Sequence, residues 1–328
     1  MESKNRGVWI LVVLAGIALC CCVVLLAAVA LTQVWGWNWG WGWGLEVQPF
    51  WQQGGGVEGA RIERTFDVGT APTLTVDNVA GNLIVRSGDG TEIRVVAVKR
   101  APLLTDLERI EVRITPQEGA LRIETTRPRT LTSASVDLTI TAPAGARLDL
   151  STGSGKVEVS GFDHGAQIHT GSGNVVAQDL AGEVALHTGS GSLTIGEFVG
   201  RLKADTGSGG IQVRGMDGEL EAHTGSGSLN VTEATGPARL STGSGGVDYQ
   251  GSPQGECRFT TGSGSITLRL PANLNAQVDL YTGSGNVRVD YPVEGLMMRS
   301  EVQGTIGRGG ETAIFAETGS GGIDVISE

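Results

Sequence analysis

Three of the four histidines in this chain occupy one repeated position, directly before a Thr-Gly-Ser-Gly motif. If the repeats stack as β-strands do, neighbouring residues of this column would lie about 5 Å apart. Imidazoles at that distance, with a carboxylate between two of them, could share a metal ion such as Zn²⁺. The column contains, in chain order, Ser151, His169, His187, Asp205, His223 and Ser241.

A plainer interpretation of this column is a solvated polar ladder, because duplication of one repeat copies its outward residues whether or not they have a function. We favour this interpretation and assign no metal site. The metal hypothesis is kept for four candidate ligands, whose affinity for Zn²⁺ or Ni²⁺ calorimetry can measure: His169, His187, Asp205 and His223.

A second candidate for chemistry is Lys203, which Asp205 and Glu221 flank on adjacent outward positions of the repeat. Carboxylates clustered with a basic residue are what polysaccharide lyases and hydrolases require. A catalytic pair also needs an enclosing cleft, and the short, uniform motifs provide no long loops to wall one. We interpret these residues as mixed surface charge. The sequence therefore predicts that the protein is not an enzyme and has no catalytic residues and no cofactor.

The element that positions all of these residues is the repeat itself. Thr-Gly-Ser-Gly occurs nine times, and the first six copies are spaced by 18 residues. A fixed period of this kind is typical of a solenoid, in which each repeat contacts only its neighbours. The motifs begin at Thr152, Thr170, Thr188, Thr206, Thr224, Thr242, Thr261, Thr282 and Thr318.

The residues around each motif alternate as in half-buried strands. Around Thr188, apolar residues lie two and four places before the threonine and five and seven places after it: Val184, Leu186, Leu193 and Ile195. This period of two indicates strands, and the inward parity changes across the motif, so the motif is predicted to be a corner. Glycine suits a corner whose neighbours lie directly above and below. The predicted fold class is all-β, a parallel β-helix of about 18 residues per coil, with Thr and Ser as structural ladders.

Three other solenoids with a similar period are excluded. A calcium β-roll needs a carboxylate two residues after the second corner glycine, where this chain has aliphatic residues such as Val157 and Leu193. A left-handed hexapeptide helix needs an aliphatic residue at every sixth position, which the alternating pairs do not match. An ice-binding solenoid needs flat outward arrays of threonine, and the outward positions here are mixed.

The net charge of the chain limits the classes of molecule that it can bind. The 328 residues carry a formal net charge of −11. An acidic exterior excludes nucleic acid, which needs a basic stripe, and it disfavours docking on anionic lipid. Three of the four cysteines, Cys20, Cys21 and Cys22, lie in an apolar segment, and Cys257 is expected to be a buried thiol. No spacing indicates a disulfide or a zinc site.

The N-terminal part predicts a membrane anchor. Residues 8–34 are apolar and uncharged, long enough to cross a bilayer as one helix. Lys4 and Arg6 precede them and favour a cytoplasmic stretch at 1–7. We favour an uncleaved signal anchor over a cleaved signal peptide or a lipoprotein modified at Cys20. Residues 35–60 form a Trp/Gly-rich juxtamembrane linker, whose tryptophans suit the headgroup layer.

The rest of the chain divides at the first regular coil. Residues 61–147 are predicted to be irregular β coils that cap the solenoid, including a degenerate coil whose corner is Asn78–Gly81. Residues 148–328 are predicted to form the regular solenoid, with one more degenerate coil in which Ser300 stands in place of the threonine. The final coil, Thr318 to Ile326, has no cap after it. Because an exposed coil edge is a template for another chain, the sequence predicts weak end-to-end self-association.

Two segments carry a resemblance to a known family. Val136–Pro143 leads into Leu148 and its Thr-Gly-Ser-Gly, and Leu268–Pro271 leads in the same way into Val278 and its own motif. This pattern resembles the bacterial putative-adhesin β-strand-repeat proteins of unknown function, over residues 61–328. The resemblance implies a right-handed parallel β-helix displayed outside the cell, and it implies no catalytic residues.

The function that these observations favour is a membrane-anchored, extracytoplasmic solenoid of the bacterial envelope. It would cross the cytoplasmic membrane once and act as a structural or adhesin-like binding element, with a glycan or a protein as ligand. One alternative is a carbohydrate-active β-helix enzyme, which a groove lined by acidic and aromatic residues would favour over a flat polar rod. Another is a component of an envelope-stress sensor, which is disfavoured because only about seven residues precede the predicted span.

Overall fold

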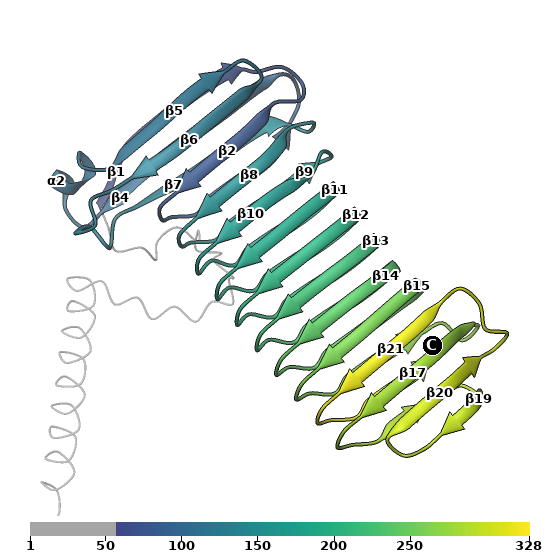
Figure 1. The fold of residues 1–328 in the computed structure, drawn as a ribbon. Coiled ribbons are helices and arrows are strands. Elements are labelled where there is room, and N and C mark those ends of the chain that lie inside the picture. The colour runs from purple at the N-terminus through teal and green to yellow at the C-terminus, as the bar shows by residue number, and fades with distance from the viewer. Residues whose placement is uncertain (1–56) are drawn as a thin grey trace, which may run out of the picture. The chain divides into compact units, whose positions relative to one another are not determined.

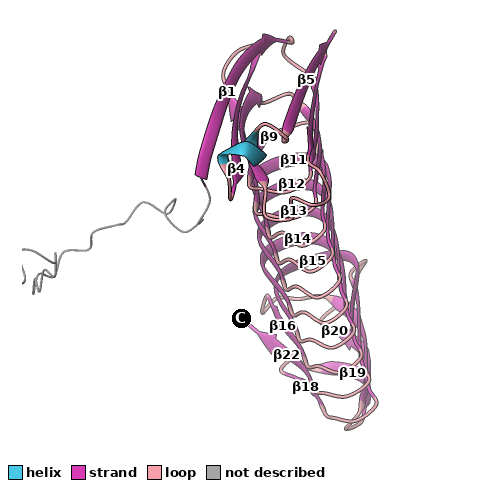
Figure 2. Cartoon of the chain, turned by 90° about the vertical axis from the view of Figure 1, so that its left-hand side faces the viewer, coloured by secondary structure: helices cyan, strands magenta, loops and turns pink. Residues whose placement is uncertain are grey.

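The computed structural model describes residues 57–328, and the anchor and most of the linker predicted at 1–56 lie outside them. The described part is all-β apart from one turn of helix, α2 (Leu104–Leu107). Between residues 57 and 328 there is no helix with the length and apolar character needed to cross a membrane. Figures 1 and 2 show a stack of coils with two long sheets.

The regular coils form because their apolar residues alternate with a period of two on both sides of each corner. Four strands of 14 residues each run from one Thr-Gly-Ser-Gly motif to the next: β11 (Val175–Thr188), β12 (Leu193–Thr206), β13 (Ile211–Thr224) and β14 (Leu229–Thr242). β11, β12 and β13 each pair in parallel with the next strand at a shift of 18 residues, so that Val175 lies beside Leu193 and Thr188 beside Thr206. Each strand also bends midway, at a second corner where Asp179 and Glu197 have φ of 52° and 49°.

The bend divides every long strand between two sheets. We call the sheet made by the arms that end at the motif the first sheet, and the one made by the arms that follow it the second sheet. The spatial order of the first sheet is β5 (Glu111–Gln117), β6 (Ala120–Thr126), β2 (Thr73–Asn78), β8 (Arg147–Thr152), β10 (Ala166–Thr170), β11 to β14, β15 (Val247–Thr261), β21 (Ala313–Thr318), β17 (Ala276–Thr282), β20 (Glu301–Ile306) and β19 (Val293–Met297). In Figure 1 this sheet faces the viewer.

The second sheet contains the remaining strands and arms. Its order is β1 (Val57–Asp67), β4 (Glu92–Ala101), β7 (Ser135–Pro143), β3 (Leu83–Gly88), β9 (Val157–Phe162), β11 to β15, β16 (Ile266–Leu270), β22 (Ile323–Ser327) and β18 (Val287–Val289). The core lies between the two sheets and forms one continuous cluster, from Leu121 on β6 near one end to Val302 on β20 near the other. Burial of such side chains contributes about 1.5–3 kcal/mol each, and each coil therefore depends on its neighbours.

At the N-terminal end the chain does not stack in sequence order. The coil of β2 and β3 lies between the coil of β6 and β7 and the coil of β8 and β9. Asn78 lies in register with Thr152, as expected of a coil whose corner is Asn-Val-Ala-Gly. Its amide donates to the Val136 carbonyl at 3.0 Å and accepts from the Thr125 hydroxyl at 2.7 Å. The antiparallel strands β1, β4 and β5 then end the parallel ladders.

The C-terminal end corrects two sequence-based predictions. The final coil, β21 and β22, is not the end of the stack but lies between the coil of β15 and β16 and the coil of β17 and β18. The segment around Ser300 is not a degenerate coil, because β19 and β20 form an antiparallel hairpin beside β17. The physical reason is that the nine Thr-Gly-Ser-Gly corners are identical, so the last coil can stack on a coil other than the one that precedes it in sequence. The exposed edge at this end of the first sheet therefore belongs to β19.

Candidate functional site

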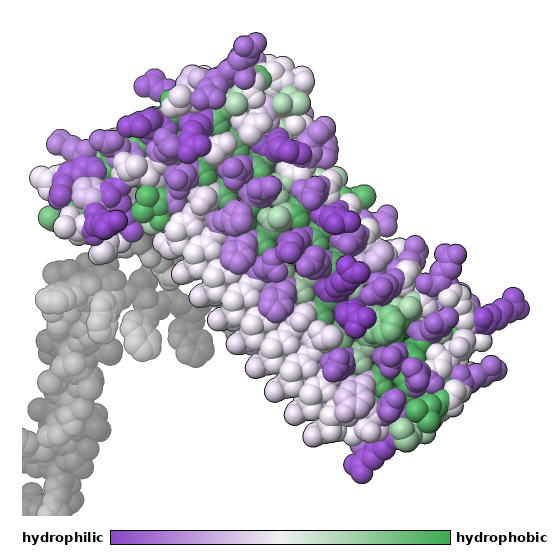
Figure 3. Space-filling model, in the orientation of Figure 1, coloured by the Kyte–Doolittle hydropathy of each residue, from purple (hydrophilic) through white to green (hydrophobic). Residues whose placement is uncertain are grey.

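The Thr-Gly-Ser-Gly motif builds the corner between the two sheets, and its threonine faces inward. Thr188 is fully buried; its hydroxyl donates to the Gly173 carbonyl of the preceding coil and accepts from the Gly191 amide, each at 3.0 Å. The same bond to the preceding coil recurs at Thr206 and Thr224. The serine at the tip of each corner is exposed, and the corner edge is nearly white in Figure 3 because Gly, Ser and Thr have intermediate hydropathy. The motif thus holds the coils together and offers no charged group for chemistry.

The histidine column lies on the outer face of the first sheet. His169 is paired in register with His187, His187 with Asp205, and Asp205 with His223. The rings of His169 and His187 are 5.9 Å apart, centroid to centroid, and tilted by 49°. Within residues 57–328, no three or more His, Cys, Asp or Glu side chains converge in a way that could hold a metal ion. The column therefore has the predicted adjacency without the convergence that a metal centre requires.

The charged residues around Lys203 pair with one another. The Lys203 Nζ lies 3.3 Å from a carboxylate oxygen of Glu221, and both side chains are half exposed. An ion pair of this exposure contributes little, typically less than about 1 kcal/mol. This arrangement is what mixed surface charge would give.

A different set of side chains meets near the C-terminal end of the same face. Four neighbouring strands contribute one row of outward residues, in the order Arg258 on β15, Phe315 on β21, Asp279 on β17 and Gln303 on β20. Two residues further along the strands, Glu317 pairs with Tyr281. Neighbouring residues within such a row are about 4.8 Å apart, the spacing of the strands. Successive rows on the same face are about 6.7 Å apart along the strands. The sheet thus presents a grid of aromatic, acidic and amide groups.

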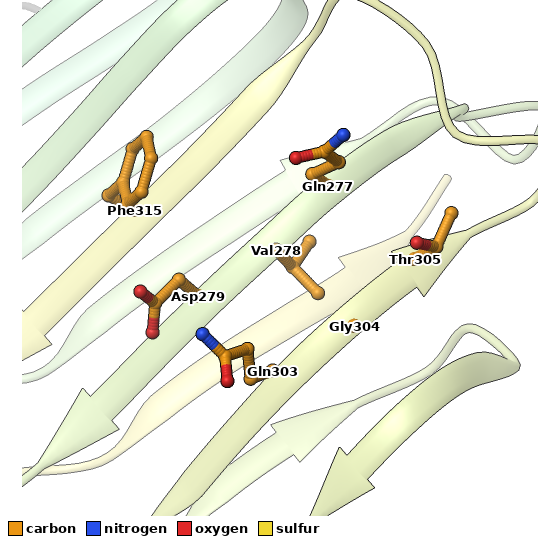
Figure 4. A pocket seen from close by; sticks show the side chains of 7 residues that line it. All are labelled: Gln277, Val278, Asp279, Gln303, Gly304, Thr305 and Phe315. Carbon is orange, nitrogen blue, oxygen red and sulfur yellow. The ribbon is translucent and has the colours of Figure 1, made fainter.

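Two adjoining hollows run across this grid, and we call them together the C-terminal groove. One, of about 290 Å³, is lined by Gln277, Asp279, Gln303, Thr305 and Phe315, with Val278 and Gly304 beneath. Figure 4 shows the Asp279 and Gln303 side chains next to each other, with Phe315 on the far side of Asp279. The other, of about 250 Å³, is lined by Arg258, Thr260, Asp279, Tyr281, Phe315, Ala316 and Glu317.

The groove combines apolar ring surface with unengaged polar groups. The Arg258 guanidinium lies 4.7 Å from the centre of the Phe315 ring, which fixes one side of the ring by a cation–π contact. Tyr281 is 48% exposed. Among residues 57–328, the side chains of Asp279, Gln277 and Gln303 make no hydrogen bond, so their donors and acceptors are available. Figure 3 shows green, apolar surface at this end of the face, to which β19 contributes the exposed Leu296.

A third hollow follows the second corner. It has a volume of about 490 Å³ and contains five carboxylates beside the exposed Val199: Asp163, Asp179, Glu197, Asp217 and Glu233. One of them, Glu233, is 3.5 Å from Arg214. This hollow has no exposed aromatic ring or amide, so it offers a ligand negative charge and little else.

Comparison with known proteins identifies the family. The family model described as Toastrack DUF4097 matches residues 74–325. The chain belongs to this Toastrack family. No curated protein matches it.

Solved structures that are similar to this Toastrack chain include two proteins described as adhesins. A putative adhesin from Parabacteroides distasonis is 13% identical, covers 82% of this chain and 98% of its own, and gives a TM-score of 0.33. A putative adhesin from Bacteroides fragilis is 14% identical, with 81% and 97% covered and a TM-score of 0.25. A putative cell adhesion protein from Clostridium sporogenes is 12% identical, with 82% and 100% covered and a TM-score of 0.26. At these values we transfer no function from them.

Sequence reasoning on this Toastrack chain missed the groove, although one signal was present. Tyr281 stands directly before Thr282, in the same outward column as the histidines, and Phe315 stands three residues before Thr318 in the neighbouring column. Reading both columns through to the last coil would have shown two aromatic residues on the outer face. Their proximity could not be read, because the stacking order brings β21 next to β17.

Proposed function

We propose that this chain is an adhesin-like binding element of the bacterial envelope, and that its C-terminal groove binds a carbohydrate. One observation carries the proposal: the row formed by Arg258, Phe315, Asp279 and Gln303 on four rigid, paired strands. A flat ring, a carboxylate and an amide on a sheet form a prearranged surface, so little ordering entropy is lost when a ligand binds.

The chemistry of the groove matches a saccharide ring. A sugar presents an apolar C–H face, which can stack on Phe315 or Tyr281, and a rim of hydroxyls. Asp279 accepts hydrogen bonds, and the Gln277 and Gln303 amides both donate and accept. The groove is open and small, near the lower end of the range for ligand sites. We therefore expect weak binding of a single sugar unit and a gain in affinity for a repeated saccharide.

The location of the protein is part of the proposal. The apolar run 8–34, preceded by Lys4 and Arg6, supports a single-pass signal anchor with the C-terminal part outside the cytoplasmic membrane. The neighbouring tryptophans of 35–60 support an interfacial linker. Protease added to intact spheroplasts should remove the solenoid and leave a membrane-bound fragment. A solenoid that is protected until the membrane is permeabilised would refute this location.

Binding is tested with a glycan array, followed by calorimetry of the full chain with each hit. The Phe315→Ala and Asp279→Asn variants should weaken binding by about tenfold or more, which corresponds to about 1.4 kcal/mol. His187→Ala is the matched control, because His187 is exposed on the same sheet but several strands away. Equal binding by all three variants, or no glycan hit for the wild-type chain, would refute carbohydrate binding in the groove.

A carbohydrate-active enzyme is the second candidate, because the groove is lined by both acidic and aromatic residues. Asp279 and Glu317 lie on adjacent strands, two residues apart along the strand direction, and glycoside hydrolysis uses a pair of carboxylates. Any glycan that binds should be incubated with the chain and assayed for new reducing ends. Release that is abolished by Glu317→Gln, with binding retained, would favour the enzyme over the binding element.

A further inference from the structure

The two sheets end in four edge strands, which are protected to very different degrees. Within residues 57–328, β1, β5, β18 and β19 each pair with only one other strand. Natural proteins block such edges with charge, with proline or by keeping the strand very short, because free backbone groups recruit other chains. Three of the four edges use one of these devices.

The protected edges are easily recognised. β1 carries Arg61, Glu63 and Arg64. β5 includes Pro116, which has no N–H to donate, and β18 is only three residues long. The fourth edge, β19, has the sequence Val-Glu-Gly-Leu-Met and a single charge, Glu294.

The side chains on β19 are also unusually apolar for a surface. Leu296 is 43% exposed, Met297 is 56% exposed and Met298, directly after the strand, is 51% exposed. Leu296 is the register partner of Gln303, so it continues the outer face that holds the C-terminal groove. An unblocked edge and an exposed apolar cluster therefore coincide at one strand.

We propose that β19 pairs with β19 of a second copy of this chain, antiparallel and about Leu296, to form a two-fold symmetric dimer. In this register Leu296 meets Leu296, and Glu294 lies opposite Met298. The two Glu294 carboxylates are then about 13 Å apart along the strands, beyond the screening length at physiological salt. The strand is thus complementary to itself in charge and in apolar surface, which is what an isologous interface requires.

The proposed dimer joins the two grooves into one continuous surface. The order across the junction is β17, β20, β19 and then the same strands reversed, so five strand spacings separate the two Asp279 residues. This is about 24 Å, and a long saccharide could occupy both grooves at once. That gain in avidity rests on the proposed carbohydrate binding, whereas the dimer itself does not.

Because one short strand per copy forms the contact, the association is expected to be weak. Sedimentation velocity of the full chain without any sugar, over a range of concentrations, should show a monomer–dimer equilibrium. Leu296→Lys places two lysines against each other and should raise the dissociation constant of the dimer by about tenfold or more. Met298→Glu places a carboxylate opposite Glu294 of the other copy and should act in the same direction. Leu104→Lys is the matched control, since Leu104 is 65% exposed at the opposite end of the stack, and it should change nothing.

Hydrogen exchange locates the contact. Backbone amides of β19 should exchange more slowly as the concentration rises, because their free N–H groups become paired. Far-UV circular dichroism of each variant confirms that it has folded. Three results would overturn the proposal: β19 amides whose exchange does not depend on concentration, a dimer that Leu296→Lys and Met298→Glu leave intact, or assemblies that grow beyond the dimer and respond to Leu104→Lys.

Discussion

We predict that the threonine hydroxyls of the corner contribute more to the free energy of unfolding than the threonine methyl groups do. Thr188 allows a direct test. Thr188→Val keeps the shape of the side chain and removes the hydroxyl. The hydroxyl joins two coils, because it donates to the Gly173 carbonyl and accepts from the Gly191 amide at 3.0 Å each. Thr188 is fully buried, so water cannot replace the lost bonds.

The magnitude follows from the two backbone groups that lose a partner. A buried group left without a hydrogen bond costs about 1–3 kcal/mol, so the loss of two partners in Thr188→Val should lower the free energy of unfolding by about 2–6 kcal/mol. Thr188→Ser keeps both hydrogen bonds and deletes one methyl group, which should cost about 1 kcal/mol. The Thr188→Ser variant should therefore be more stable than Thr188→Val, whereas apolar burial alone would predict the opposite order.

Urea denaturation of the full chain, followed by circular dichroism, measures both variants. Thr194→Val is the control, because Thr194 is exposed in the same coil, and it should stay within about 0.5 kcal/mol of the wild type. If Thr188→Val is as stable as Thr188→Ser or more stable, the hydroxyl ladder does not hold the coils together and our account of the corner is wrong.

Three further predictions concern packing and titration in the core. Gly191→Ala should destabilise the fold by more than about 2 kcal/mol, because its Cβ would lie 1.8 Å from the Gly173 carbonyl oxygen. In the control Gly196→Ala, in the same coil, the Cβ meets only a side-chain carbon at 3.9 Å and the change should be tolerated, so similar unfolding midpoints of the two variants would contradict this prediction. Tyr249→Phe should be neutral or stabilising by about 1 kcal/mol, since the buried Tyr249 hydroxyl has no partner among the described residues; a large loss of stability would reveal a missed hydrogen bond. Burial raises the pKa of both Tyr249 and Cys257 above their ordinary values. Their contribution to the unfolding free energy should therefore be constant below about pH 8.5 and fall above it, and an unfolding midpoint that is unchanged between about pH 8 and about pH 10.5 would refute this.

Much of the fold could be predicted because each coil is specified locally. The alternation around Thr188 sets which side chains face inward, and the 18-residue spacing sets the register between neighbours, as the pairing of Thr188 with Thr206 shows. The burial of the threonine ladder follows from the same parity. These properties depend on residues close together in the chain, where the steric and hydrophobic preferences of a strand and a corner act.

The candidate site could not be predicted in the same way, because its residues come from four strands that are far apart in sequence. Arg258, Phe315, Asp279 and Gln303 form one row only because β21 lies between β15 and β17. Identical corners make every coil edge an equally good surface for stacking, so the sequence alone determined the coil but left the order of the coils open. The tertiary structure decided that order. The last coil lies between two others, and β19 and β20 fold back as a hairpin beside β17. Both arrangements pair strand edges that sequential stacking would leave free.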